Sequence, residues 1–224
     1  MSTDRDIALR AMRNPSVAAF LEGTFASDAD GTPSVCWRGE HGEWTPGFQT
    51  KLASLSFGSR EAACIYATDP NDRRMSARAP RISPWLLRIA RPVMNAPDDP
   101  FIDLPLLVQA IGREATTALA LRMADHIVDT GNWHENFEST WGCDLAGLLR
   151  WRPASIDDLY LVAYNVFDDA EAVALLRTAG HDGAICGGMG ENALETEWRL
   201  FDAGNALPAW CAGATAARRM LRAA

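Results

Sequence analysis

Two glutamates stand two residues apart near the end of the chain, in Glu195-Thr196-Glu197-Trp198-Arg199-Leu200-Phe201. This mixture of aromatic, branched and polar residues predicts a strand over 196–201. Strand alternation then directs Glu197 to the same face as Arg199, opposite Trp198 and Leu200. If the strand extends back to Glu195, both carboxylates share that face. Such groups can stabilise a developing positive charge or accept a proton, whereas the spacing also arises by chance in an acidic chain.

Other residue types offer less chemistry. The four histidines do not form a ligand set, and the five cysteines lack a Cys-x-x-Cys pair, so no metal site is predicted. Gly187-Gly188-Met189-Gly190 has no following Gly-Lys-Ser and does not predict a phosphate-binding loop. We expect a flexible loop there, leading into the glutamate strand.

Length and charge narrow the class of protein. With 224 residues and 48% hydrophobic content, the chain predicts one folded domain over residues 1–224. A formal net charge of -8 disfavours binding to nucleic acid without excluding it. The N-terminus has no secretory signal and no run of eighteen apolar residues occurs, so we expect a cytoplasmic protein without membrane contact.

Local signals in the first half predict alternating short helices and strands. Residues 1–30 should contain a helix that starts at Asn14-Pro15-Ser16. Strands should follow at 34–39 and 55–57. Ser59 is placed to cap a helix that carries Ala62, Ala63, Ile65 and Tyr66. The segment Asp69 to Pro84 should be an exposed loop, followed by a core strand over 85–89 that Pro92 ends.

The second half is predicted to be richer in helix. Apolar spacing predicts a helical pair between Asp103 and Gly131, and another short helix over 155–162. Asp168 or Asp169 should cap a helix over 172–179, which Gly180 ends. Strands are expected at 183–186 and 196–201.

Several of these segments, in this order, resemble the ADP-ribosyltransferase superfamily, in particular its compact phage and bacterial-effector branch. The resemblance covers about 33–207, interrupted by a helical stretch over 101–152. It is carried by these pieces: Val35-Cys36-Trp37-Arg38-Gly39, Ser54-Leu55-Ser56-Phe57-Gly58-Ser59, Ala62-Ala63-Cys64-Ile65-Tyr66-Ala67, Trp85 to Pro92, Ala179-Gly180-His181-Asp182-Gly183-Ala184-Ile185 and Glu195 to Asp202.

The resemblance implies an α+β fold with a split mixed and antiparallel β-sheet, a helical insertion at 101–152, and NAD as the substrate. Glu197 would be the catalytic glutamate that stabilises the ribosyl cation. Glu195 would be the general base of an arginine-modifying enzyme, with an ordinary surface carboxylate as the alternative. Arg38 would hold the diphosphate, with a solvated strand-end residue as the alternative.

The resemblance also assigns the remaining cofactor contacts. Ser56 would orient Glu197, and Gly39 and Ser59 would line the NAD site. Phe57 or Tyr66 would pack against nicotinamide, although Tyr66 on an apolar helix face is more often a core residue. Ser54-Leu55-Ser56 departs from the family's full Ser-Thr-Ser motif, which leaves the subclass open.

The implied activity is a mono-ADP-ribosyltransferase that modifies a protein acceptor as a phage or bacterial effector or toxin. The first alternative is an NAD glycohydrolase, in which water replaces the acceptor. The second is a catalytically inactive module of the same fold that inhibits a host protein by binding it. A nucleic-acid acceptor remains a further alternative within the enzyme class.

Overall fold

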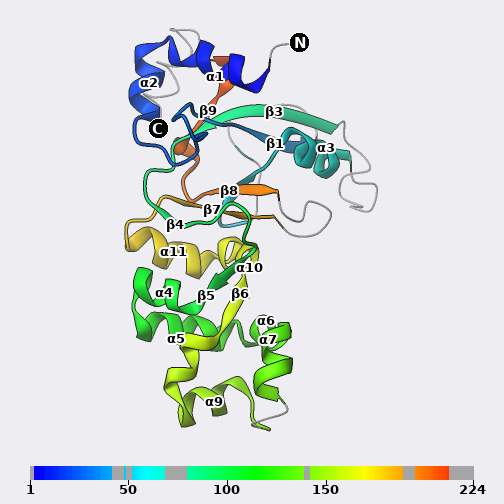
Figure 1. Cartoon of the computed structure of the whole chain (residues 1–224), viewed down its shortest axis with the longest axis vertical. Coiled ribbons are helices and arrows are strands. Elements are labelled where there is room, and N and C mark those ends of the chain that lie inside the picture. Colours follow the sequence, from blue (N-terminus) through cyan, green and yellow to red (C-terminus); the bar gives the residue numbers. More distant parts are fainter. Residues whose placement is uncertain are drawn as a thin grey trace.

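The computed structural model describes residues 3–41, 48, 52–68, 80–138, 142–188 and 195–211. These residues form an α+β structure with antiparallel and mixed sheets, which is the coarse fold class that the sequence predicts. Two sheets lie in the upper and middle part of the molecule, with N-terminal helices above and most other helices below (Figure 1).

Two helices precede the first strand, where the sequence analysis expected one. Helix α2 (Pro15–Leu21) begins as predicted, because Asn14 caps it and Pro15 occupies its first turn. Helix α1 (Asp4–Met12) begins with a capping box between Thr3 and Asp6. Its sequence is charged and buries only two alanines, which explains why apolar spacing did not reveal it.

The upper sheet has the strand order β1-β3-β9, with both pairs antiparallel. Its strands are β1 (Val35–His41), β3 (Pro80–Leu87) and β9 (Ala206–Pro208). The prediction of an exposed loop over 69–84 is therefore wrong for 80–84, whereas 69–79 lie outside the described residues. The next strand, β4 (Pro92–Asn95), begins at the proline that was expected only to end a strand.

The lower sheet has the order β2-β8-β7-β4, and its β4–β7 pair is parallel. The strands β2 (Leu55–Phe57), β7 (Gly183–Gly187) and β8 (Thr196–Leu200) agree closely with the sequence prediction. Of the predicted glycine-rich loop between β7 and β8, residues 189–194 lie outside the described part. Strand β2 forms one edge of this sheet, which places Ser56 at its margin.

A shared hydrophobic core joins the facing sides of the two sheets. It contains Cys36, Trp85 and Leu87 from the upper sheet, and Leu55, Phe57, Ile185 and Leu200 from the lower one. Helix α3 (Arg60–Thr68) packs on the outer side of β1, where a Cβ on Gly39 would meet the Ala63 carbonyl oxygen at 2.2 Å. Only a glycine allows this close approach between helix and strand.

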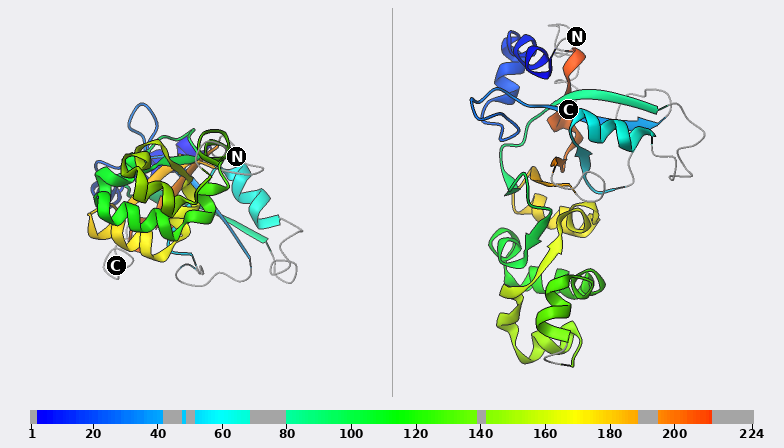
Figure 2. Two further views of the ribbon diagram at one scale, coloured as in Figure 1. Left: turned by 90° about the horizontal axis from the view of Figure 1, so that it is seen from below. Right: turned by 45° about the vertical axis from the view of Figure 1, so that its right-hand side comes forward.

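The other side of the lower sheet packs against a helical unit, visible below β7 and β8 in Figure 1 and at the bottom of the right-hand view of Figure 2. Its helices include α4 (Leu104–Ile111), α5 (Arg113–Arg122), α6 (Ala124–Val128), α7 (Gly131–Trp133), α9 (Leu145–Trp151), α10 (Ala163–Asp168) and α11 (Ala170–Thr178). The stretch 101–152, predicted to be helical, begins with β5 (Phe101–Asp103), and most of its other described residues are in helices.

Strand β5 pairs with β6 (Tyr160–Val162), so the short helix expected over 155–162 is a 3-10 turn at 153–158 followed by a strand. Asp169, not Asp168, caps α11 by accepting the backbone N–H of Ala172.

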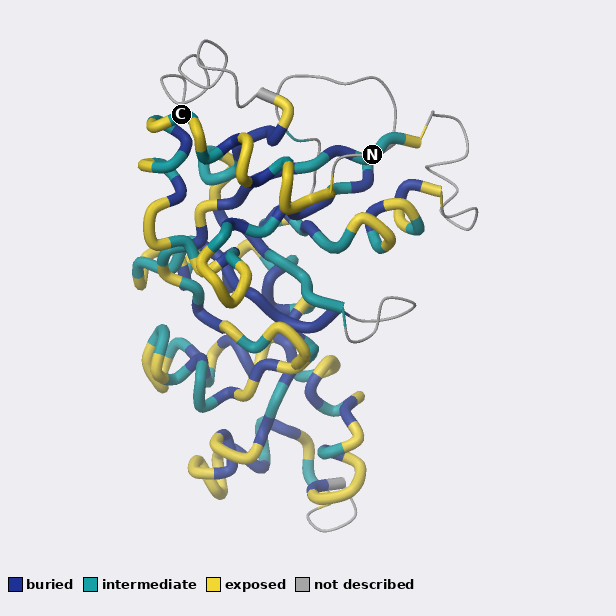
Figure 3. Tube along the Cα trace, turned by 45° about the horizontal axis from the view of Figure 1, so that its top comes forward, coloured by how far each residue is buried: buried dark blue, intermediate teal, exposed yellow. Residues whose placement is uncertain are grey.

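Figure 3 shows buried residues along the strands and exposed ones on the outer sides of the helices. Within the described ranges, no helix combines the length and apolar character needed to cross a membrane.

Candidate functional site

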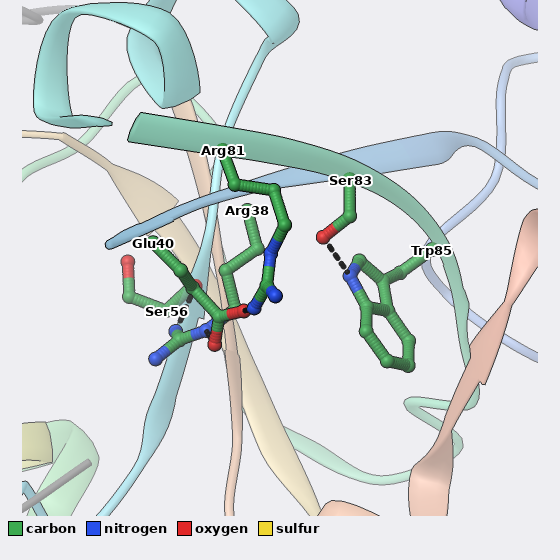
Figure 4. A network of polar contacts seen from close by, with 6 residues as sticks. All are labelled: Arg38, Glu40, Ser56, Arg81, Ser83 and Trp85. Carbon is green, nitrogen blue, oxygen red and sulfur yellow. Dashed lines mark hydrogen bonds and ion pairs between the residues drawn. The ribbon is translucent and has the colours of Figure 1, made fainter. Parts of the chain in front are cut away.

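Ser56 links the two residues that the sequence analysis placed at the centre of the site. Its hydroxyl donates a hydrogen bond to Glu197 Oε1, across 141 positions of sequence. Its backbone carbonyl accepts a hydrogen bond of 2.8 Å from Arg38 Nη1 (Figure 4). Arg38 and Glu197, which lie far apart in the chain, therefore meet at one edge residue of the lower sheet.

The strand register explains which side chains share a face. Ser56 pairs with Arg199 across β2 and β8, and Glu197 pairs with Cys186 across β8 and β7. Ser56, Glu197 and Arg199 therefore lie on the side of the sheet that faces the helical unit. The sequence analysis expected Glu197 and Arg199 together and opposite Trp198, and the register agrees.

A buried arginine accompanies the Glu197 carboxylate. Arg199 is only 4% exposed, and its Nε lies 3.0 Å from Glu197 Oε1. Its Nη1 donates to Asp168 Oδ1 at 2.5 Å and to Ser54 Oγ at 3.3 Å. Burial by itself lowers the pKa of Arg199, but the neighbouring charges of Glu197 and Asp168 leave that pKa raised. The guanidinium is therefore a fixed positive charge.

Arg38 belongs to a second charged cluster, on the inner face of the upper sheet (Figure 4). Its Nε lies 3.0 Å from Glu40 Oε1, while Arg81 Nη2 lies 2.5 Å from Glu40 Oε2. Two guanidinium groups thus share one carboxylate, leaving one excess positive charge. The Arg38 side chain is 12% exposed and lies over the rings of Phe48 and Phe57, so it is not a solvated strand-end residue.

Arg81 contributes donors that the described residues leave unused. Its Nε and Nη1 are buried and find no hydrogen-bond partner within the described part of the chain. Arg38, in contrast, already uses Nε and Nη1 for Glu40 and Ser56. These two bonds use two of the five N–H donors of the guanidinium, so the predicted bidentate grip of Arg38 on phosphate would have to come from its remaining Nη hydrogens.

The second glutamate is held by a second serine. Ser59 Oγ donates to Glu195 Oε2 at 2.5 Å and accepts the backbone N–H of Ala62 at 3.0 Å. Ser59 thus caps α3, as predicted, and also connects the start of that helix to the segment before β8. Both glutamates of the pair are accordingly held by serines, Ser56 in β2 and Ser59 at the start of α3.

Three predicted cofactor contacts have different surroundings in the structure. Phe57 is 1% exposed and packs in the core between the sheets, so its predicted contact with nicotinamide does not fit this conformation. Tyr66 is 57% exposed, and the alternative that it is a core residue is wrong. Gly39 is explained by the packing of α3 on β1.

A cavity of about 490 Å³ lies next to this site, on the opposite face of β8. Its lining includes Ser59, Arg60, Thr196 and Trp198, but not Arg38, Ser56 or Glu197. It therefore adjoins the Ser59–Glu195 pair and not the Ser56–Glu197 pair. The contacts between charged groups, and not this cavity, single out the candidate reacting residues.

Four residues of the two clusters were not singled out from sequence: Glu40, Arg81, Asp168 and Arg199. Arg199 was expected on the same face as Glu197, but nothing in the sequence indicated that Arg199 would pair with Asp168. Asp168 was considered only as a helix cap, a role that Asp169 takes. Arg81 fell in a segment expected to be a loop, whereas in β3 it stands opposite Glu40.

The described residues contain no group of three or more His, Cys, Asp or Glu side chains that could hold a metal ion. Comparisons with protein-family models, curated proteins and solved structures find no match to this chain. We therefore infer a function from the geometry and charge of the site.

Proposed function

We propose that the protein is an NAD-dependent mono-ADP-ribosyltransferase that uses Glu197 to stabilise the ribosyl cation and modifies a protein acceptor. The observation that carries the proposal is the chain of contacts from Arg38 through Ser56 to Glu197. It brings a phosphate-binding residue type and a fixed carboxylate to one place. An NAD molecule has an anionic diphosphate at one end of its ribose and a cationic leaving group at the other, which matches that pair.

Glu197 would act on the bond between nicotinamide and ribose. When this bond breaks, its electron pair leaves with nicotinamide and positive charge develops on the ribose. A carboxylate fixed in advance stabilises that charge in the transition state more than in the ground state. The hydrogen bond from Ser56 and the nearby Arg199 fix the Glu197 carboxylate before substrate arrives.

The arginine cluster on the upper sheet would hold the diphosphate. Arg38 and Arg81 together carry one positive charge more than Glu40 neutralises. A phosphate oxygen would bind the buried Nε and Nη1 donors of Arg81, to which no described residue offers an acceptor. Arg81 would thus share the role that the sequence analysis gave to Arg38 alone.

Glu195 would activate the acceptor. Its carboxylate lies beside Ser59, at the margin of the cavity on the other face of β8. An acceptor side chain beside Glu195 would lose a proton to it as it attacks the ribose. The resemblance to the arginine-modifying subclass favours arginine as this side chain.

The decisive experiment measures NAD cleavage and label transfer in parallel. The purified protein is incubated with NAD labelled in its adenylate part, with and without bacterial lysate, and free nicotinamide and labelled protein are quantified. We expect labelled protein in the lysate sample. Glu197→Gln should lower the rate about 10²–10³-fold, on the order of 3–4 kcal/mol of transition-state stabilisation.

The matched control is Glu114→Gln, which changes an exposed glutamate of α5 far along the chain from either cluster and should leave the rate unchanged. Free ADP-ribose without labelled protein would identify a glycohydrolase instead. No nicotinamide release by the wild-type protein, together with no heat of NAD binding in calorimetry, would refute the enzyme and favour the inactive binding module.

A further inference from the structure

Arg199 lies deeper than either carboxylate that contacts it. Its side chain is 5% exposed, whereas those of Glu197 and Asp168 are 18% and 26% exposed. A buried guanidinium is retained only when opposite charges compensate the loss of hydration. Arg199 is therefore held in place by its partners, and in turn it restricts where they can lie.

The two carboxylates contact Arg199 in different ways. Asp168 accepts a hydrogen bond from Nη1 at 2.5 Å. Glu197 lies 3.0 Å from Nε, yet Nε makes no hydrogen bond with any described residue, so this contact is electrostatic attraction without hydrogen-bond alignment. The hydrogen bond on the Glu197 carboxylate comes from Ser56. Asp168 consequently binds Arg199 more directly than Glu197 does.

The cluster of Arg199, Glu197 and Asp168 has a net negative charge. One guanidinium stands between two carboxylates, so the three groups together carry a charge of about -1. Without Asp168, the positive charge of Arg199 would be balanced by Glu197 alone. Asp168 therefore preserves the negative charge that Glu197 presents to a developing cation.

Asp168 reaches Arg199 from the helical unit. It is the last residue of α10, and the next residue, Asp169, caps α11 and pairs with Arg122 of α5 at 2.5 Å. The consecutive aspartates thus connect one strand of the lower sheet to three helices. The helical unit has a direct contact with the strand that carries Glu197.

We propose that Arg199 is a positioning residue for Glu197 and that Asp168 sets both its orientation and the net charge of the site. The proposal rests on the function proposed above, because Glu197 must be the catalytic carboxylate. It also gives the helical unit a role, which is to supply the aspartate that completes the site.

The loss of the Arg199 charge and the loss of its positioning contact have opposite expected effects on kcat in the variant Arg199→Gln. Arg199→Gln removes the positive charge beside Glu197, so electrostatics alone would favour the cation and raise kcat. Loss of position would lower kcat, because displacement of a reacting group by about 1 Å can cost 10²-fold. We expect kcat to fall about 10- to 100-fold, with the KM for NAD changed less than about threefold.

Asp168→Asn tests the charge directly. It keeps an oxygen that can accept from Arg199 Nη1 but removes one negative charge, so Arg199 then neutralises Glu197. We expect kcat to fall at least about tenfold while the KM for NAD is unchanged. The matched control is Arg122→Gln, which breaks the neighbouring exposed pair with Asp169 and should leave both constants unchanged.

The measurements are kcat and KM for nicotinamide release by the full chain, with thermal unfolding of each variant as a check on folding. If Arg199→Gln does not fold, Arg199→Lys replaces it, since lysine keeps the charge but lacks the planar fork. Unchanged or raised kcat in Arg199→Gln or Arg199→Lys would overturn the positioning role. Unchanged kcat in folded Asp168→Asn would show that Asp168 does not set the net charge of the site around Glu197.

A crystal structure of the same variants separates this proposal from the proposed function. If the wild-type protein releases no nicotinamide, the enzyme proposal fails, but the position of Glu197 can still be observed. We expect its carboxylate to leave Ser56 Oγ in Arg199→Gln, or in Arg199→Lys if only that variant folds. A Glu197 side chain that keeps the hydrogen bond from Ser56 without Arg199 would show that Arg199 does not position it.

Discussion

Replacement of Gly39 by alanine should push helix α3 away from strand β1. The added Cβ would lie 2.2 Å from the Ala63 carbonyl oxygen, 3.2 Å from its carbon and 3.1 Å from the Ala67 nitrogen. All three are backbone atoms, so no side chain can rotate to make room. Real Cβ contacts essentially never fall below 3.0 Å, so helix and strand must separate by roughly 1 Å.

The expected cost follows from this overlap. Overpacking of a well-packed interface typically destabilises a protein by about 1–3 kcal/mol. In a chain of this size, each kcal/mol lowers Tm by about 2–4 °C, which gives a fall of roughly 2–12 °C for Gly39→Ala. Differential scanning calorimetry of the full chain measures it directly, provided that unfolding is reversible.

Gly131→Ala is the matched control. No atom lies within 4 Å of a Cβ built at Gly131, which is the first residue of α7. Alanine favours helix over glycine by up to about 1 kcal/mol, so its Tm should stay equal or rise slightly. A Gly39→Ala variant with the Tm of the wild-type protein would refute the close approach of α3 to β1.

Three further predictions concern stability and thiol reactivity. Asp182 accepts two backbone N–H groups at 2.9 Å, so Asp182→Ala should lose about 2–3 kcal/mol in urea unfolding, whereas an unchanged free energy of unfolding would contradict those bonds. Burial, followed by the charge of Glu197, raises the pKa of Cys186 to about 12, so iodoacetamide at pH 8 should label exposed Cys64 first and Cys186 only after unfolding, as mass spectrometry can show. A hydrogen bond from Arg122 lowers the pKa of Asp169, so this pair stabilises the fold above about pH 4 and its contribution disappears as the pH falls through the lowered value. Unfolding curves of Arg122→Gln between pH 6 and pH 2 should therefore depend less on pH than those of the wild-type protein.

The elements that the sequence predicted well are those whose signals are local. Ser59 and Asp169 cap the helices that follow them, because a short polar side chain reaches backbone N–H groups two or three residues ahead. Strand β2 was predicted from Leu55-Ser56-Phe57, whose outer two residues are buried and whose serine is not. The two caps need only neighbouring residues, and the pattern of β2 can be recognised before its pairing with β8 is known.

The elements that were missed depend on tertiary contacts. Strand β3 contains Pro80 and Pro84, which argue against a central strand. They are tolerated because β9 pairs only with residues 85–87, so that β3 is an edge strand along 80–84. Strand β6, which pairs with β5, was missed because its residues were assigned to the end of the helix predicted over 155–162.

The candidate site divides in the same way. Glu197, Ser56 and Arg38 came from short motifs and their order, together with the resemblance that they carry. Asp168 stands 31 positions from Arg199, and only the packing of α10 against the lower sheet brings them together. A single sequence holds no local signal for such a pair, which is why the charge balance around Glu197 could not be predicted.

The most direct measurement is a crystal structure of the Glu197→Gln variant soaked with NAD, since this variant should bind the dinucleotide without cleaving it. We predict that the ribose carbon bonded to nicotinamide lies beside residue 197, with the diphosphate in contact with Arg38 or Arg81. NAD bound elsewhere, with neither residue 197 nor these arginines in contact, or no bound NAD at saturating concentration, would contradict the proposed function.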